Sequence, residues 1–80
     1  MEPDPFVRIL AEEQARLGIN DQAFADLFGI RREHWSRLKR NLRALGLGTV
    51  RSVFAHYRHP AGKHRSDECL ACRLSDALAS

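Results

Sequence analysis

Residues 20–41 read NDQAFADLFGIRREHWSRLKRN, and this stretch decides the fold that the sequence predicts. Asn20 is a preferred helix N-cap residue, and the apolar residues after it recur at helical spacing. Gly29 then suits the left-handed conformation that commonly follows a helix. Beyond the glycine, Trp35 and Leu38 lie three residues apart and form the buried edge of another helix. The stretch therefore predicts two short helices joined by a tight turn.

The small and apolar residues of this stretch indicate that the two helices pack at a steep angle. Ala25, four residues before the glycine, keeps their crossing narrow, and Ile30 anchors the second helix to the core. We expect that helix to begin at Arg31 or Arg32. Asn41 is a suitable C-cap residue because asparagine tolerates positive φ.

Helix signals also lie on both sides of the stretch. A first helix is expected from Asp4 or Pro5 to Gly18, since proline and aspartate favour a first turn and glycine a C-cap. After a connection over residues 42–48, with a possible helical turn around Leu45, Thr49 is expected to cap a fourth helix. Glu13 or Gln14 interrupts the apolar stripe of the first helix. The expected apolar residues are Phe6, Leu10 and Leu17 in the first helix, Ala23, Phe24, Leu27 and Phe28 in the second, and Val50, Val53, Phe54 and Tyr57 in the fourth.

The C-terminal part predicts one more helix. Residues 59–65 form a polar loop with Pro60, and Ser66, Asp67 and Glu68 are suited to open a helix in which leucines recur every four residues (Leu70, Leu74, Leu78). No segment alternates apolar and polar residues, so we expect no sheet. The sequence thus predicts a compact all-α fold of four or five helices, with residues 1–58 as the functional domain. Residues 59–80 add a loop and an amphipathic helix for packing, for dimerisation or for both.

The charge of the chain is unevenly placed. The 80 residues carry a net charge of +3, but residues 31–65 contain ten Lys or Arg and one acid, Glu33, and net +9. The remaining residues net −6. This asymmetry favours one face that meets a polyanion, and a solvated basic face without a partner is the alternative.

Residues 20–41 resemble the phage repressor and Cro family, the xenobiotic-response-element type of helix-turn-helix. The family pattern is Gln, three residues, Ala, three residues, Gly and an apolar residue, followed by polar residues and an apolar-Ser-x-apolar stretch. The resemblance implies a lambda-repressor-like fold and DNA binding, and it extends more weakly over residues 6–57. The matching residues are Ala25, Gly29, Ile30, Trp35, Ser36 and Leu38.

Three residues depart from the family pattern. Asp21 replaces a glutamine that commonly binds phosphate, and a carboxylate there would repel phosphate, although its neighbour Gln22 could substitute. Lys39 stands where glutamate is common, which removes a possible intramolecular ion pair. Asn41 stands where glycine is common.

In the family, the second helix of the motif lies in the major groove of DNA. If Trp35 and Leu38 face the core, the helical period turns the polar residues of that helix outward. Arg32 and Arg37 are then candidates for guanine contacts, and Glu33 for accepting from cytosine N4. His34 is expected to be a partly buried neighbour of the turn. The complete set of expected DNA-binding residues is Arg31, Arg32, Glu33, Ser36, Arg37, Lys39, Arg40 and Arg43, of which Lys39, Arg40 and Arg43 are expected at phosphates.

The aromatic residues and the cysteines each allow a second interpretation. Trp35 could stack on a base, but core packing is favoured at an apolar position. Cys69 and Cys72 form a Cys-x-x-Cys pair that, with His59 and His64, could hold zinc. Since the pair falls in an amphipathic helix, packing or a reactive thiol is the favoured interpretation and no cofactor is expected.

The function that we expect from the sequence is that of a small bacterial or phage transcriptional regulator, a cytoplasmic repressor that binds operator DNA as a homodimer. No apolar run approaches the length of about 20 residues that is needed to span a membrane. The sequence also contains no nucleophile paired with a base, no glycine-rich phosphate loop and no convincing metal cage, so we expect no enzyme. The alternative is a protein-binding module on the same scaffold, such as an antitoxin, an inhibitor or a polymerase-binding factor. Asp21 favours this alternative and the basic helix favours DNA.

Overall fold

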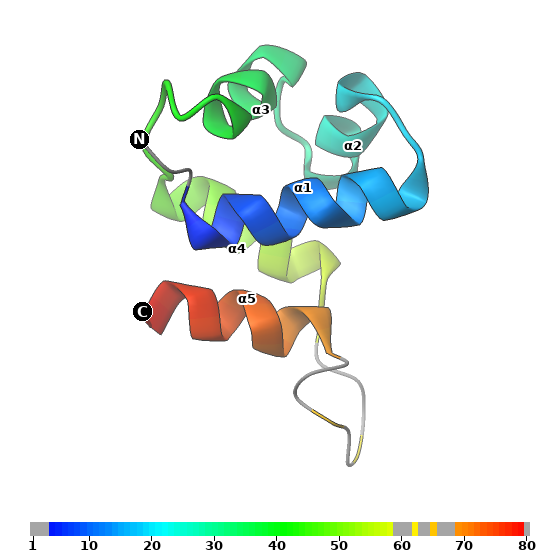
Figure 1. The fold of residues 1–80 in the computed structure, drawn as a ribbon, viewed down its shortest axis with the longest axis vertical. Helices are drawn as coiled ribbons and strands as arrows, with labels where there is room; N and C mark the ends of the chain where they lie inside the picture. The colour runs from blue at the N-terminus through cyan, green and yellow to red at the C-terminus, as the bar shows by residue number, and fades with distance from the viewer. Residues whose placement is uncertain (1–3, 59–61, 63–64, 66–68, 80) are drawn as a thin grey trace.

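Helices are the regular secondary structure in the part of the chain that the computed structural model describes, residues 4–58, 62, 65 and 69–79. Figure 1 shows α1 lying between α5 on one side and the α2 and α3 pair on the other. This confirms the prediction of an all-α fold without strands over the described residues. The helices are α1 (Pro5–Leu17), α2 (Asp21–Phe28), α3 (Arg32–Lys39), α4 (Leu47–His56) and α5 (Leu70–Ala79).

The predicted boundaries of α1 and α2 are confirmed. Asp4 caps α1, because its side chain accepts a hydrogen bond of 2.8 Å from the backbone N–H of Phe6. Asn20 caps α2 in the same way at the N–H of Ala23, at 2.8 Å. Gly18 and Gly29 end the two helices at a φ of 68°, a conformation that disfavours residues with a Cβ atom. Local chemistry therefore defines both helices.

The start of α4 differs from the prediction. Thr49 does not cap this helix, since α4 begins two residues earlier at Leu47, after Gly46, and no side chain caps it. No helical turn forms around Leu45 either. Thr49 lies inside the first turn of α4 and is buried, and its hydroxyl lies 3.0 Å from His34 Nε2. The Thr49 hydroxyl, which the sequence predicted to cap α4, therefore contacts His34 of another helix instead.

The core forms where aromatic residues of α2 and α3 meet α1 and α4. The Phe24 ring lies 5.0 Å, centroid to centroid, from both the Phe28 and the Trp35 rings. Trp35 is fully buried, so the core interpretation of this residue is confirmed. Leu17, Ala23 and Leu27 were expected on the apolar faces of their helices, but all three are exposed, Leu17 at 41% and Leu27 at 39%. The residues that fill the core are Phe6, Val7, Leu10, Phe24, Ala25, Phe28, Trp35, Leu38, Val53 and Leu74.

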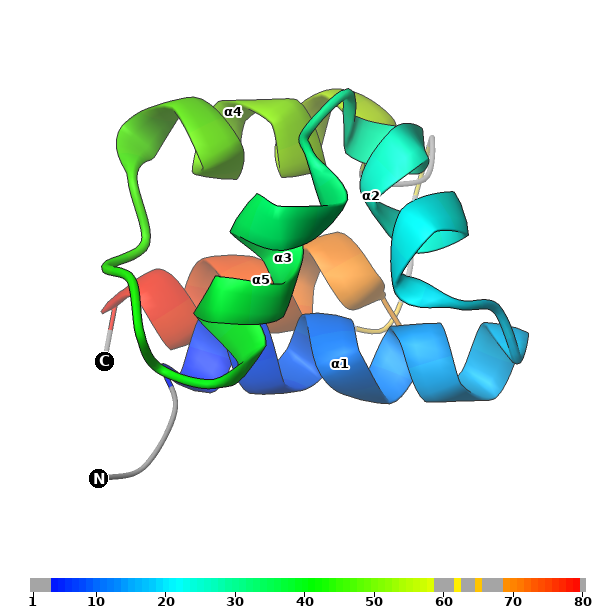
Figure 2. The ribbon, with the colours of Figure 1, turned by 90° about the horizontal axis from the view of Figure 1, so that it is seen from above.

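The last helix belongs to this same core. Figures 1 and 2 show α5 running antiparallel beside α1, and Arg73 pairs with Glu12 of α1 at 3.2 Å. Leu74 is 0% exposed, so it does not contribute to a two-fold interface, whereas Leu78 is 46% exposed. The helix begins at Leu70, and the residues expected to open it, 66–68, lie outside the described residues.

None of the helices in the described part of the chain is long and apolar enough to cross a membrane.

Substitution of Leu74 tests whether α5 is needed for the fold. Leu74→Ala should lower the free energy of unfolding by about 2 to 4 kcal/mol, because it leaves a cavity between α5 and α1. Urea unfolding followed by circular dichroism measures this loss. Leu78→Ala is the matched control and should change the free energy by less than about 0.5 kcal/mol. Equal, small effects of the two substitutions would show that α5 does not contribute to the core.

Candidate nucleic-acid interface

Helix α3 presents one face to the core and the other to solvent. Trp35 and Leu38 are buried and hold the helix against α1 and α2. The opposite face carries Arg32, Glu33, Arg37 and Arg40, all exposed, with Ser36 half-buried among them. The division predicted from the helical period is therefore present.

The connections at the two ends of α3 fix this orientation. At its start, the N–H of Ile30 donates to the carbonyl oxygen of Ala25 at 3.2 Å, across the turn at Gly29. Ala25 is fully buried, as expected for a narrow crossing of α2 and α3. At its end, Arg40 is the C-cap residue and not Asn41 as predicted, and Asn41 follows it with a φ of 58°. The N–H of Leu42 donates to the carbonyl oxygen of Arg37 at 2.9 Å. The exposed face of α3 is thus held by backbone hydrogen bonds at both ends.

Three adjoining surface depressions surround this face. The first lies along α3 between Arg32 and Arg40 and is also lined by Asp21. The second lies on the side of the turn and extends to Arg43, and the third lies at the start of α2 beside Arg32. We call the seven predicted residues that line them the arginine face: Arg31, Arg32, Glu33, Ser36, Arg37, Arg40 and Arg43.

Lys39 is the predicted DNA-binding residue that does not line these depressions. Its Nζ atom lies 2.5 Å from Asp21 Oδ1 and 3.3 Å from Gln14 Oε1, and it lies over the ring of Trp35, 5.6 Å from the centroid. The sequence suggested that a lysine here removes an ion pair. The structure corrects this expectation, because Lys39 itself forms an ion pair with Asp21.

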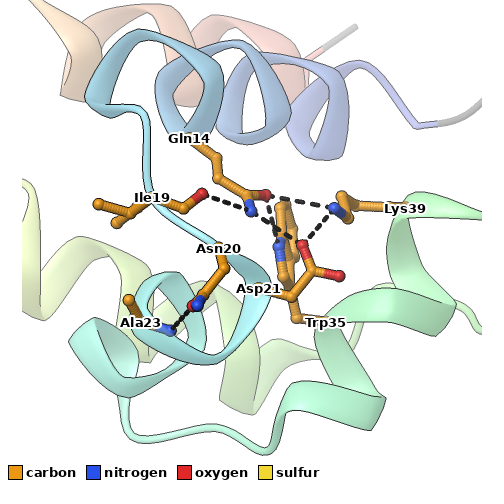
Figure 3. A network of polar contacts seen from close by, with 7 residues as sticks. All are labelled: Gln14, Ile19, Asn20, Asp21, Ala23, Trp35 and Lys39. Atoms are coloured by element: carbon orange, nitrogen blue, oxygen red, sulfur yellow. Dashed lines mark hydrogen bonds and ion pairs between the residues drawn. The ribbon is translucent and has the colours of Figure 1, made fainter.

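The Gln14 side chain lies at the centre of a polar network that joins three helices (Figure 3). Its Oε1 accepts from Trp35 Nε1 at 2.9 Å, and its Nε2 donates to Asp21 Oδ1 at 2.8 Å. The same Nε2 also donates to the carbonyl oxygen of Ile19 at 3.1 Å. Gln14 is only 8% exposed, so these contacts satisfy an amide that would otherwise be costly to bury. Sequence reasoning missed this role, although the break in the apolar stripe of α1 marked the position.

Asp21 is therefore a paired carboxylate. Hydrogen bonds from Lys39 and then Gln14 lower the pKa of Asp21 below its ordinary value of 3.8, and the charges of Lys39 and Arg32 add to this effect. The carboxylate stays ionised at neutral pH, with its charge largely compensated by Lys39. A negative charge at the start of α2 is thus part of the packing between α2 and α3.

Glu33 is an exposed carboxylate within the arginine face. Its Oε1 lies 3.5 Å from the Arg32 guanidinium, and both side chains are exposed. A hydrogen bond with its own backbone lowers the pKa of Glu33, and Arg32 and Arg31 lower it further. Glu33 therefore remains charged among the arginines.

His34 lies at the edge of the arginine face. It is half-buried, as expected for a neighbour of the turn, and its contact with Thr49 links α3 to α4. Burial lowers the pKa of His34, and the positive charges of Arg43 and Arg37 lower it further. The imidazole is therefore neutral at pH 7 and adds no charge to this surface.

The zinc interpretation gains no ligand set from the described residues. Cys69 is buried, Cys72 is half-buried, and no group of three or more His, Cys, Asp or Glu side chains in the described part of the chain is placed to hold a metal ion. His59 and His64, which the sequence offered as further ligands, lie outside the described residues.

No protein-family model, curated protein or solved structure matches this chain. Geometry and charge are thus the evidence for a function. They bring five arginines, Glu33 and Ser36 together on the solvent side of α3.

The pairing of Asp21 predicts a pH-dependent contribution to stability. Because the pKa of Asp21 is lower in the folded than in the unfolded chain, its stabilisation is present above about pH 3.8 and is lost as the pH falls through the folded pKa. Asp21→Asn should therefore lower the free energy of unfolding at pH 7 by about 1 kcal/mol. The difference from the wild-type protein should shrink below pH 3.8, in urea titrations at several pH values.

Asp26→Asn provides the matched control. Asp26 is an exposed aspartate of the same helix, and it accepts a hydrogen bond from Gln22 at 2.8 Å. Its substitution should change the free energy of unfolding by less than about 0.5 kcal/mol. If the two variants behave alike at every pH, the Asp21 pair does not stabilise the fold.

Proposed function

We propose that this protein is a sequence-specific DNA-binding regulator of transcription, in which α2, the turn at Gly29 and α3 act as a helix-turn-helix. The observation that carries the proposal is the arginine face, where five exposed arginines surround the solvent side of one short helix. Arginine binds phosphate oxygens and guanine edges through the same planar set of donors. A face of this composition suits the surface of duplex DNA.

The dimensions of α3 support binding in the major groove. Its eight residues give a length of about 12 Å, and an α-helix with its side chains is about 10–12 Å across. The major groove of B-form DNA is about 12 Å wide and admits one helix. In this arrangement Arg32 and Arg37 face base edges, while Arg31, Arg40 and Arg43 lie nearer the phosphates. Lys39, held by Asp21, leaves the predicted set of phosphate contacts.

Repression by occupation of an operator is the regulatory mode that we propose. A single α3 reads only a few base pairs, so a homodimer that places two of them about 34 Å apart gives a longer and more selective site. Leu74 is committed to the core of its own chain. The leucines that leave apolar surface for a second copy, within the described residues, are Leu17, Leu27, Leu42, Leu47 and Leu78, of which Leu42 and Leu47 are the most exposed.

An acidic protein partner is the alternative occupant of the arginine face. Asp21 was the residue that favoured this alternative. Its carboxylate accepts hydrogen bonds from Lys39 and Gln14 within the fold, so it no longer argues for a protein partner. Salt separates the two functions. Binding to duplex DNA should weaken as salt rises, with a logarithmic slope of about −0.9 for each phosphate contacted.

Loss of Arg32 or Arg37 tests the proposed DNA contacts. Arg32→Ala and Arg37→Ala should each weaken binding to a duplex selected from random DNA by about 1 to 3 kcal/mol, because each removes a bidentate donor. Binding to unrelated duplexes should weaken less. Fluorescence anisotropy at fixed salt concentration measures both affinities.

Arg16→Ala is the matched control for this experiment. Arg16 pairs with Glu13 on α1 and lies in a depression with Tyr57 and Arg73, away from α3. Its loss removes the same charge and should leave the affinity for the selected duplex within about twofold. Unchanged affinity in both α3 variants would exclude the arginine face as the DNA-binding surface.

A further inference from the structure

Glu33 is a negative charge at the centre of a positive surface. It is the single acid among residues 31–65, and it lines both depressions that flank Arg37. Its side chain is exposed, so the fold does not need it for core packing. Its position on the arginine face therefore calls for a role at that surface.

Arg32 is close to two carboxylates. Glu33 Oε1 is 3.5 Å from its guanidinium, and Asp21 lines the same two depressions as Arg32. The charge of Arg32 also contributes to the lowered pKa of Asp21. By contrast, Arg37, Arg40 and Arg43 form no ion pair within the described residues. The arginine face thus contains a mixed-charge cluster (Arg32, Glu33 and Asp21) beside unpaired arginines.

These two parts of the surface suit different parts of DNA. At the mixed-charge cluster Glu33 offsets the charge of Arg32, and Lys39 offsets that of Asp21, so a phosphate is attracted less there than at the unpaired arginines. The floor of the major groove is different. It offers the amino group of cytosine, from which a carboxylate accepts a hydrogen bond, and the O6 and N7 atoms of guanine, to which a guanidinium donates. The mixed-charge cluster therefore suits base edges better than it suits phosphate.

We infer that Arg32 and Glu33 together read cytosine–guanine base pairs, with Glu33 accepting from cytosine N4 and Arg32 donating to guanine O6 and N7. The inference rests on the proposed function and adds a specificity-determining role for Glu33. Its carboxylate reads one base and also lowers the affinity of the arginine face for unrelated DNA. Discrimination then comes from both effects, since specificity is a difference between two affinities.

The test compares the wild-type protein with Glu33→Gln. Each protein selects sites from random duplex DNA, and anisotropy gives its affinity for the selected site and for an unrelated duplex. The wild-type protein should select cytosine at a position where Glu33→Gln shows no such preference. Loss of the charge should also raise the affinity for the unrelated duplex roughly two- to fivefold. The ratio of specific to non-specific affinity should fall about tenfold.

Glu12→Gln is the matched control, since it makes the same change at an exposed glutamate of α1. Glu12 pairs with Arg73 of α5 and is not part of the arginine face. It should keep the wild-type site and affinity ratio, and thermal unfolding should show that both variants are folded. Unchanged base preference and affinity ratio in Glu33→Gln would overturn the inference alone. The inference would also be overturned if the positions at which Glu33→Gln changes the base preference hold no cytosine in the site that the wild-type protein selects. A wild-type protein that binds no duplex would overturn the proposed function and this inference with it.

Discussion

The rest of the structure depends on one buried amide. The Gln14 side chain of α1 contacts Trp35 and Lys39 of α3 and Asp21 of α2, so a single group fixes three helices relative to one another (Figure 3). Each of these contacts satisfies a polar atom that packing has removed from water. Because polar contacts require specific distances and directions, the network sets the position of α3 more closely than apolar packing alone would.

This network also decides which charges remain on the surface. Lys39 and Asp21 compensate each other inside it, and their charges become part of the packing between α2 and α3. The arginines of α3 and of its two connections stay exposed to solvent beside it. The positive character of the arginine face thus comes from residues that the fold does not use, which leaves their side chains available for a ligand.

The small size of the chain explains the part played by α5. A domain of this length buries a limited share of its surface, so each helix has to cover another. Helix α5 covers α1 with Leu74 and adds the contact of Arg73 with Glu12. On the other side of the core, His34 meets Thr49 and links the arginine face to α4. The helix that carries the proposed DNA contacts is therefore supported from α1, α2 and α4.

The sequence by itself determined the features that depend on neighbouring residues. Asp4 and Asn20 cap helices and Gly18 and Gly29 end them because each acts on backbone within a few positions. The part of the arginine face that lies on α3 was predictable for a similar reason, since the helical period opposes it to Trp35 and Leu38. Only the tertiary structure decided that Gln14 is buried, that Thr49 meets His34, that Leu17 and Leu27 are exposed and that Lys39 pairs with Asp21. These outcomes depend on groups that the folded chain brings together from distant positions, and helical spacing carries no information about such distances.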